Sequence, residues 1–403
     1  MNLKLAWRNI WRNRKRSIIT IASIALAVFL AIFMRSMQLG MYANMIHNVV
    51  GSYTGYIQVH GKNYWEEKTL DNALDYEKNL EDKLLNIKGV EAVIPRLESF
   101  SLASNDTVTK GVYINGVIPE KEKMVKSISS RLIAGSIFKN EGQIIIGKGV
   151  AKFFNLKISD TLVMIGQGYH GMSAAGKFHI AGIADMKNPT LNNMSVFMSL
   201  KALQNYLSAN GIITNLVIVK KEGVNEKALR KAIENNLSDD YEVMTWQEML
   251  PELEQTILID SIGGLLMVAI LYMIITFGIF GTVLMMTQER MYEFGVMVAI
   301  GMKKIKLMVI VLIETILLTL LGVLLGIIAV MPISYYFHLN PYVLPGDQAA
   351  VMEKFGFESV VPFSIDYHIP LYHGLLIFVI ALIITIYPLM IIAKLKPLKA
   401  MKV

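Results

Sequence analysis

Four long apolar segments constrain this chain more than any other feature of its sequence. They cover residues 17–38, 257–286, 307–331 and 371–393, and charged side chains are rare in all of them. A helix needs about 20 apolar residues to cross the hydrocarbon core of a bilayer. Lipid cannot satisfy backbone polar groups, so a segment that spans the membrane has to be helical or part of a closed barrel. The sequence therefore predicts an α-helical membrane protein with four transmembrane helices.

The charged residues indicate how these helices are oriented. Basic side chains crowd into residues 1–16, 287–306 and 394–403, and Trp7 and Trp11 suit an amphipathic segment at the headgroup level. Basic flanks favour the cytoplasm. We expect both termini and residues 287–306 to be cytoplasmic, with residues 39–256 and a loop at 332–370 outside. No small-residue cleavage site follows the first segment, which favours a retained anchor over a signal peptide.

The remaining composition narrows the function classes. The chain is 54% hydrophobic yet 18% charged, as expected for a membrane protein with one substantial water-exposed domain. The net charge is +7, but the basic residues crowd beside the apolar segments and form no aromatic-basic patch. We therefore do not expect nucleic-acid binding. The seven histidines show no metal-ligand spacing, and we assign no metal site and no catalytic residue.

The segment 39–256 repeats one local pattern. Residues 55–60, 74–86 and 90–95 read as strand, helix and strand, and residues 215–219, 225–237 and 241–245 repeat that order. Two such units that enclose an insertion predict a split ferredoxin-like α+β domain, formed by residues 53–99 and 211–246. Residues 100–210 would be a β-rich insert.

Residues 287–306 are a short charged segment held between two apolar ones. Acids begin the segment and lysines end it, which suits a helix dipole. Met291, Phe294 and Val298 would form one apolar face of a short helix lying on the membrane. On spacing alone, an ordinary basic loop explains the segment equally well.

The order of residues here resembles a known family. Glu289-Arg290, Glu293-x-Gly295 and Ala299-Ile300-Gly301, followed by Glu314 and Gly322-x-x-x-Gly326, closely resemble the permease family of FtsX, MacB and LolC/LolE. In that family this segment is the coupling helix that docks into a cytoplasmic ATPase. The resemblance implies an ATPase-coupling role for six residues: Glu289, Arg290, Glu293, Phe294, Gly295 and Gly301.

The resemblance also implies an assembly. Two permease subunits, identical or homologous, would join an ABC ATPase dimer that binds ATP and magnesium, while this chain would bind no cofactor and would not be an enzyme. Glu314, Gly322 and Gly326 would couple movements within the membrane. A neutral hydrogen-bonding role for Glu314 is a close alternative. A lipid-facing substrate cavity between the permeases would be lined by Ile24, Val28, Phe33, Leu266, Ile270 and Phe277.

The order of the whole outer domain is most like the LolC/LolE branch, with residues 53–99 and 211–246 as its porter domain. The resemblance then implies release of lipoproteins from the outer leaflet of the bacterial inner membrane. A MacB-like efflux machine that transmits mechanical work, an FtsX-like regulator of a cell-wall hydrolase, and a receptor without an ATPase are the alternatives.

Two glycine-rich strings need separate interpretation. Residues 142–149 nearly spell a phosphate-binding loop, but Gly149 stands where a Ser or Thr is required. We read that string as a strand and turn. Residues 166–171 match a dinucleotide-binding string, but they lie between two strands, so residues 167–177 are expected to be a flexible hairpin tip. Its residues Gln167, Tyr169 and His170 are a candidate contact for a periplasmic lipoprotein carrier, although the proline-containing hook of the LolC branch is missing.

Overall fold

The computed structural model describes residues 2–12, 14–105, 108–123, 128–354 and 358–396. Residues 397–403 of the predicted cytoplasmic tail therefore lie outside the described part of the chain. The chain divides into two compact units, one of residues 1–43, 256–342 and 360–403 and the other of residues 44–255 and 343–359. Each unit is described by itself.

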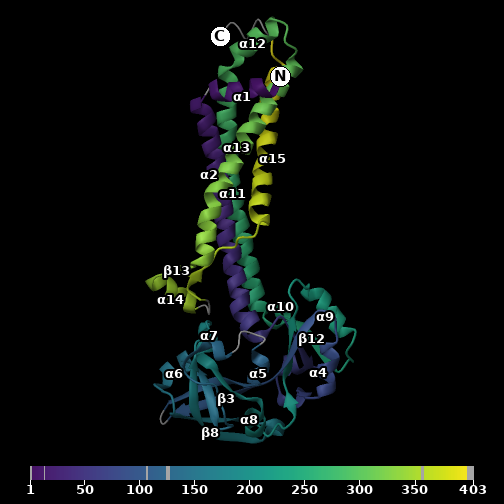
Figure 1. Cartoon of the computed structure of the whole chain (residues 1–403), viewed down its shortest axis with the longest axis vertical. Coiled ribbons are helices and arrows are strands. Elements are labelled where there is room, and N and C mark those ends of the chain that lie inside the picture. Colours follow the sequence, from purple (N-terminus) through teal and green to yellow (C-terminus); the bar gives the residue numbers. More distant parts are fainter. Residues whose placement is uncertain (1, 13, 106–107, 124–127, 355–357, 397–403) are drawn as a thin grey trace. The chain divides into compact units, whose positions relative to one another are not determined.

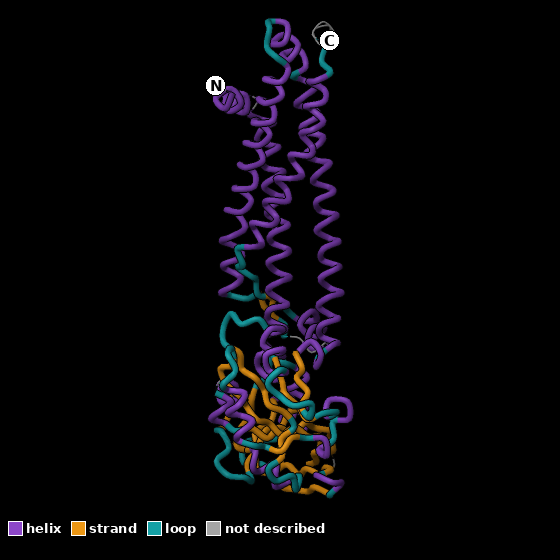
Figure 2. Tube along the Cα trace, turned by 90° about the vertical axis from the view of Figure 1, so that its right-hand side faces the viewer, coloured by secondary structure: helices purple, strands orange, loops and turns teal. Residues whose placement is uncertain are grey.

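The first unit is a helical bundle (Figures 1 and 2). In the described part of the chain, four helices are long and apolar enough to cross a membrane. They are α2 (Arg14–Ile46), α11 (Pro251–Glu289), α13 (Lys304–Leu339) and α15 (His368–Ala393). These helices extend beyond the predicted apolar segments, because helical hydrogen bonding does not stop where the hydrophobic pattern ends. Two shorter helices, α1 (Asn2–Arg12) and α12 (Met291–Ala299), complete the bundle.

Helices α2 and α13 pack closely through two glycines. A Cβ placed on Gly322 would lie 2.6 Å from Cβ of Ile24, and one on Gly326 would lie 2.7 Å from Cβ of Val28. Such distances are too short for any side chain, so only glycine lets the two backbones approach this far. Helix α15 approaches α13 in the same way, because a Cβ on Gly374 would lie 3.0 Å from Val323.

The second unit is built on a mixed sheet of ten strands among the described residues, in the order β12-β1-β11-β3-β4-β9-β6-β8-β5 with β7 beside β3 and β8. The strands of this unit are β1 (Ile57–Gly61), β2 (Leu74–Asp75), β3 (Val90–Asn105), β4 (Val108–Val117), β5 (Leu132–Gly135), β6 (Gln143–Gly147), β7 (Thr161–Gln167), β8 (Ser173–Ala184), β9 (Ser195–Ser199), β10 (Ile212–Ile213), β11 (Asn215–Lys220) and β12 (Tyr241–Thr245). Strands β2 and β10 form a separate pair outside the large sheet, and β13 (Tyr342–Val343) and β14 (Val360–Val361) form another.

Short helices connect these strands. They are α3 (Tyr64–Glu67), α4 (Lys78–Leu85), α5 (Pro119–Glu122), α6 (Lys148–Phe154), α7 (Pro189–Met194), α8 (Leu200–Tyr206), α9 (Glu226–Glu234), α10 (Trp246–Met249) and α14 (Gly346–Lys354), with a π-helix η1 (His47–Thr54) and 3-10 turns η2 (Leu70–Asn72), η3 (Ile128–Arg131) and η4 (Tyr169–Gly171). One apolar core joins strands from both halves of the sheet, including Val59, Leu97, Ile114 and Ile180.

The strands of the two repeated units lie side by side in the sheet. β1 and β3 come from the first unit and β11 and β12 from the second, and their spatial order is β12-β1-β11-β3, with antiparallel neighbours throughout. Helix α4 connects the first pair and α9 the second. Numbered along the chain as strands 1 to 4, the order is 4-1-3-2, so each helix crosses over a strand of the other unit.

Three local expectations for this domain were wrong. Residues 74–86 do not form one helix, because Leu74–Asp75 pair with β10 as a strand and α4 begins only at Lys78. The string at 142–149 is a strand followed by helix α6, not a strand and turn. The ammonium of Lys148 donates to the Asp185 carboxylate at 2.9 Å. In a nucleotide-binding loop this ammonium would instead bind a phosphate group.

The hairpin tip also differs from the expectation, both in its length and in its packing. Strand β8 already begins at Ser173, so the tip is shorter than the predicted residues 167–177. Within the tip, the backbone N–H of Tyr169 donates to the Leu207 carbonyl at 2.8 Å, and His170 lies 3.1 Å from Asp71 in η2. The tip therefore packs back onto the domain and is not a free, flexible loop.

Candidate functional site

The chain reverses direction at the end of the second long helix, and the candidate site forms there. Helix α11 ends at Glu289 and α12 begins at Met291, with Arg290 between them in a non-helical conformation. At the far end of α12, Met302 N–H donates to the Met297 carbonyl and Gly301 N–H to the Val298 carbonyl. This pair of bonds is a Schellman motif, and it requires the positive φ of 105° found at Gly301. Gly301 is thus needed to end α12.

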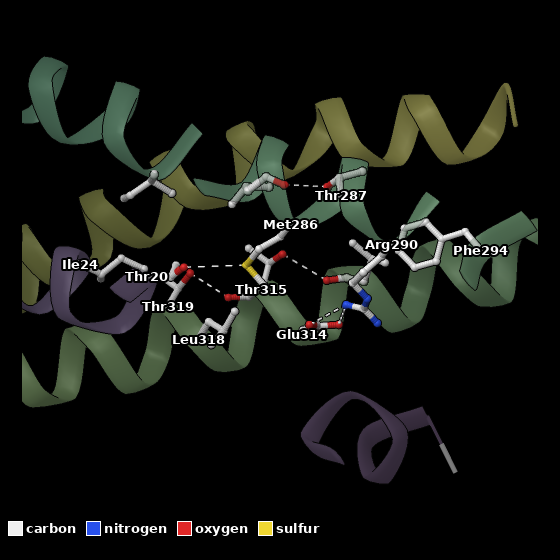
Figure 3. A pocket seen from close by; sticks show the side chains of 13 residues that line it. Thr20, Ile24, Met286, Thr287, Arg290, Phe294, Glu314, Thr315, Leu318 and Thr319 are labelled. Carbon is white, nitrogen blue, oxygen red and sulfur yellow. Dashed lines mark hydrogen bonds and ion pairs between the residues drawn. The ribbon is translucent and has the colours of Figure 1, made fainter. Parts of the chain in front are cut away.

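Arg290 forms a buried ion pair with Glu314 of α13 (Figure 3). One terminal nitrogen, Nη1, donates to both carboxylate oxygens, at 2.8 and 2.7 Å. Arg290 is only 7% exposed and Glu314 only 4%. Taking two charges out of water is costly unless they are paired and well hydrogen-bonded. The intramembrane carboxylate predicted from the sequence therefore has a cationic partner in the turn that starts the 287–306 segment.

The surroundings of this pair are apolar. The guanidinium carbon of Arg290 lies 5.2 Å from the centre of the Phe294 ring, which is 1% exposed. Phe294 packs with Leu307 and Val311 of α13 and with Ile392 near the end of α15. A cavity of about 30 Å³ beside Arg290 and Glu314 has room for a water molecule. The low local polarity strengthens the attraction between the two charges.

Threonine hydroxyls near the pair need no further partner. Thr287, Thr315 and Thr319 each donate to the backbone carbonyl four residues earlier, at 2.7, 3.1 and 2.8 Å (Figure 3). This is the usual way for a hydroxyl to be satisfied inside a helix. Arg290 and Glu314 are therefore the charged groups around which this end of the bundle is organised.

The two acids of the segment bind the N-terminal part of the same chain. Glu289 pairs with Arg16 and Glu293 with Arg12. Helix α1 is held there by Ile10, which packs with Met286 and Leu318, while Trp7 and Trp11 remain exposed. Sequence reasoning missed these pairs, although Arg12 and Arg16 have the same four-residue spacing as Glu289 and Glu293.

The apolar face predicted for residues 287–306 points inward. Phe294 and Gly295 are buried, and Met291 and Val298 pack against the same cluster as Phe294. The expectation that this face lies on the membrane or anchors another protein is therefore wrong. The large apolar side chains of the segment that are exposed are Tyr292, Ile300 and Ile305, with exposed fractions of 56%, 81% and 69%.

The residues predicted to line a substrate cavity divide into two groups. Ile24 and Val28 are buried against Gly322 and Gly326, and Phe33 packs on Phe363 at 5.0 Å between ring centres. Ile24 and Val28 therefore belong to the interior of this chain's own bundle, and Phe33 is partly buried against it. Leu266, Ile270 and Phe277 on α11 are exposed.

The candidate carrier-contact residues belong to the second compact unit, which contains residues 44–255 and 343–359. Gln167 lines a hollow with Lys68 and Ser99, Tyr169 is partly buried in the main core, and His170 pairs with Asp71. Among the described residues, no cluster of three or more His, Cys, Asp or Glu side chains could hold a metal ion.

Two protein families match this chain. The MacB-like periplasmic core domain matches residues 17–236, and the FtsX-like permease C-terminal domain matches residues 265–397. The second match contains Arg290 and Glu314 together with all of α12 and α13.

Curated relatives and solved structures are similar over about half of the chain. The macrolide export ATP-binding/permease protein MacB of Escherichia coli is 26% identical over 225 residues, which is 53% of this chain and 34% of that protein. MacB 2 of Escherichia coli O1:K1 / APEC has the same values. The chain thus spans about a third of the length of these relatives.

Two solved structures are similar to about half of this chain. The periplasmic region of MacB from Actinobacillus actinomycetemcomitans has a TM-score of 0.35 at 12% identity, over 51% of this chain and 94% of that one. The extracellular domain of the noncanonic ABC-type transporter YknZ from Gram-positive bacteria has a TM-score of 0.34 at 13% identity, over 47% and 100%.

Proposed function

This chain belongs to the family of the MacB-like periplasmic core domain and carries an FtsX-like permease C-terminal domain, and from that premise we propose that it is the permease subunit of an ABC transporter. The observation that carries the proposal is the buried Arg290–Glu314 pair. It joins the segment between α11 and α13 to the interior of a membrane-spanning helix. A force applied to that segment would reach α13 through a bond that is costly to break.

In this proposal the contact with an ATPase lies on the exposed side of the segment. Tyr292 and Ile300 are exposed, and Ile300 lies three residues before Lys303, which is also exposed. A few desolvated apolar anchors usually carry most of the energy of an interface. Glu289 and Glu293 then act indirectly, by holding the start of α2 and the end of α1 against the segment through Arg16 and Arg12. ATP and magnesium belong to the ATPase, and this chain binds neither.

A second copy, or a homologous permease, would pack against α11. This helix is the least buried of the four long ones, and Leu266, Ile270 and Phe277 are exposed on it. Among the described residues, no atom lies within 4 Å of a Cβ placed on Gly263, Gly278 or Gly281. Small residues that are free in one chain allow close approach by a helix of another.

For the substrate, we propose lipoproteins held in the outer leaflet of a bacterial inner membrane. The exposed apolar face of α11 suits acyl chains, and movement of the outer domain would expel the lipidated cargo. The strand order 4-1-3-2 supports a ferredoxin-like porter core for that domain. A periplasmic carrier that accepts the lipoprotein is a further possible partner.

The second candidate is a MacB-like efflux machine, in which the permease works a periplasmic pump without passing substrate through the membrane. The match to the MacB-like core domain over residues 17–236 favours this function as much as the first. An FtsX-like regulator that activates a cell-wall hydrolase is a third option, with no cargo.

Reconstitution separates these functions. The chain would be purified from native membranes with its bound proteins, and the co-purifying ATPase would be placed with it in liposomes that contain a fluorescent triacylated lipoprotein. We expect ATP-dependent appearance of the lipoprotein in the soluble fraction, and none with an ATPase that cannot hydrolyse ATP. Turnover without release would contradict lipoprotein transport and favour the efflux machine, and the absence of any bound ATPase would contradict the permease assignment.

A further inference from the structure

The outer domain contains a cavity of about 350 Å³ that the permease function does not use. It lies where the neighbouring strands β1, β11 and β3 meet helix α3. Aromatic side chains form much of its wall: Tyr53, Tyr64, Trp65, Phe100 and Tyr113. We call this space the aromatic cavity. All of its lining residues belong to one compact unit of the chain.

Three hydrogen-bond acceptors in the aromatic cavity are buried and unpaired among the described residues. They are Nε2 of His60, Oε1 of Glu98 and Oδ1 of Asn215. His60 is 0% exposed and Asn215 is 1% exposed. Nδ1 of His60 lies 3.2 Å from the Thr214 carbonyl oxygen, which can only accept, so Nδ1 carries the proton and Nε2 is left as an acceptor. Nδ2 of Asn215 donates to Thr214 Oγ1 at 3.3 Å, which leaves Oδ1 free.

Unpaired buried acceptors are costly, and folded proteins rarely keep three together. A ligand that brings several N–H or O–H donors would satisfy them. Aromatic faces attract organic cations. Among ligands with several donors, a positively charged one therefore fits this cavity best.

Glu98 gives the cavity wall a negative charge, which also favours a positively charged ligand. Arg96 donates two hydrogen bonds to Glu122, at 2.7 and 2.9 Å, and Lys68, an exposed residue of the cavity wall, has its Nζ 4.2 Å from the Trp65 ring centre. Among the cavity's described side chains, Glu98 and Lys68 are the charged groups and neither forms an ion pair, so Glu98 is the anion that a bound ammonium would neutralise.

We propose that the aromatic cavity binds a primary ammonium group carried on an apolar body, with Glu98, His60 and Asn215 accepting its three N–H bonds. The ammonium supplies three donors for three acceptors, and the aromatic side chains enclose the apolar body. This site is independent of ATPase coupling, so its failure would leave the proposed transport function unaffected.

Ionisation predicts how binding depends on pH. Burial raises the pKa of the Glu98 carboxyl, while Arg96 and a hydrogen bond from the Asn215 side chain lower it, Glu122 raises it and Lys68 lowers it. Burial lowers the pKa of His60 to about 4, so the imidazole stays neutral above that pH. Burial also raises the pKa values of Tyr53 and Tyr64, which keeps both phenols neutral. Affinity for an ammonium should therefore rise with pH as free Glu98 ionises, until the amine itself loses its proton at about pH 10.

The test is calorimetric titration of the full chain in detergent with three small probes. Phenethylamine carries a primary ammonium, benzyltrimethylammonium is a cation without N–H donors, and 2-phenylethanol is neutral. We expect phenethylamine to bind at least about tenfold more tightly than either of the others. Equal binding of 2-phenylethanol would overturn the proposal in favour of a neutral apolar pocket. No binding of phenethylamine would also overturn it, and would mean that water alone satisfies the acceptors.

Variants of the chain test whether phenethylamine binds in the aromatic cavity. Glu98→Gln keeps the shape of the side chain but removes its charge, and we expect it to weaken phenethylamine binding by at least about tenfold and to abolish the rise with pH. The matched control is Glu91→Gln on the same strand, an exposed carboxylate that is not part of the cavity wall. Thermal melting checks that both variants fold. Unchanged affinity in folded Glu98→Gln, or an equal loss in Glu91→Gln, would overturn the proposal.

Discussion

The Arg290–Glu314 pair shows how much one contact can decide at the scale of single residues. Both side chains are buried, and Nη1 of Arg290 binds both oxygens of Glu314. Removing Arg290 and removing Glu314 should not destabilise the chain equally. A carboxyl left alone can take up a proton and become neutral, whereas a guanidinium keeps its charge at any accessible pH. The arginine is thus the more costly residue to leave without its partner.

This asymmetry gives the first prediction. Glu314→Gln should destabilise the chain by about 3–5 kcal/mol, because it leaves a buried charge uncompensated. Arg290→Met should cost less, and the double variant Arg290→Met/Glu314→Gln should recover most of the loss. Glu289→Gln, which removes a carboxylate that is 41% exposed and is paired with the partly exposed Arg16, is the control and should cost about 0–1 kcal/mol. Thermal melting of the purified chain measures all four, and wild-type melting of Glu314→Gln would contradict the buried pair.

At the scale of elements, glycines distinguish contacts within the chain from contacts it could make with another. Gly322 and Gly326 let α2 approach α13, whereas Gly278 and Gly281 on α11 have no neighbour among the described residues. The same residue type therefore has two different uses in two neighbouring helices.

The second prediction compares these two sets. Gly322→Leu should push α2 away from α13, since the new Cβ alone would lie 2.6 Å from Ile24, and should lower the melting temperature strongly. Gly278→Leu should leave the melting of the chain unchanged but prevent permease dimers, which size-exclusion chromatography with light scattering can measure. Dimers that persist in Gly278→Leu would show that α11 does not form the permease interface.

Part of this architecture could be predicted from the sequence, for physical reasons. Long apolar segments have few alternatives in lipid, so the four helices could be predicted, and a β-rich outer domain followed from alternating patterns. The direction in which an apolar helical face points could not be predicted from the sequence. Phe294 and Val28 each lie on an apolar helical stripe, and such a stripe looks the same whether it meets lipid, a partner or the chain's own core. Both side chains meet the chain's own core.

At the scale of the whole molecule, the absence of cysteine makes the orientation directly testable. Single cysteines at Lys177 and Asp347 should react with an impermeant thiol reagent added to intact cells whose outer membrane is permeabilised. A cysteine at Lys303 should react only after the inner membrane is opened. All three side chains are exposed, so burial cannot explain a difference. Labelling of Lys303→Cys in sealed cells would reverse the orientation derived from the basic flanks.

The central claim is that the exposed side of residues 287–306 contacts a partner ATPase, and co-purification of that ATPase tests it most directly. Tyr292→Lys and Ile300→Lys change exposed side chains of the segment, so the bundle should still fold. Each should reduce the ATPase recovered with the chain to about a tenth of the wild-type amount, as expected for the loss of an anchor worth about 1.4 kcal/mol. Tyr367→Lys makes a comparable change at an exposed aromatic residue in the predicted outer loop and should retain full recovery. Wild-type recovery with both Tyr292→Lys and Ile300→Lys would contradict the account.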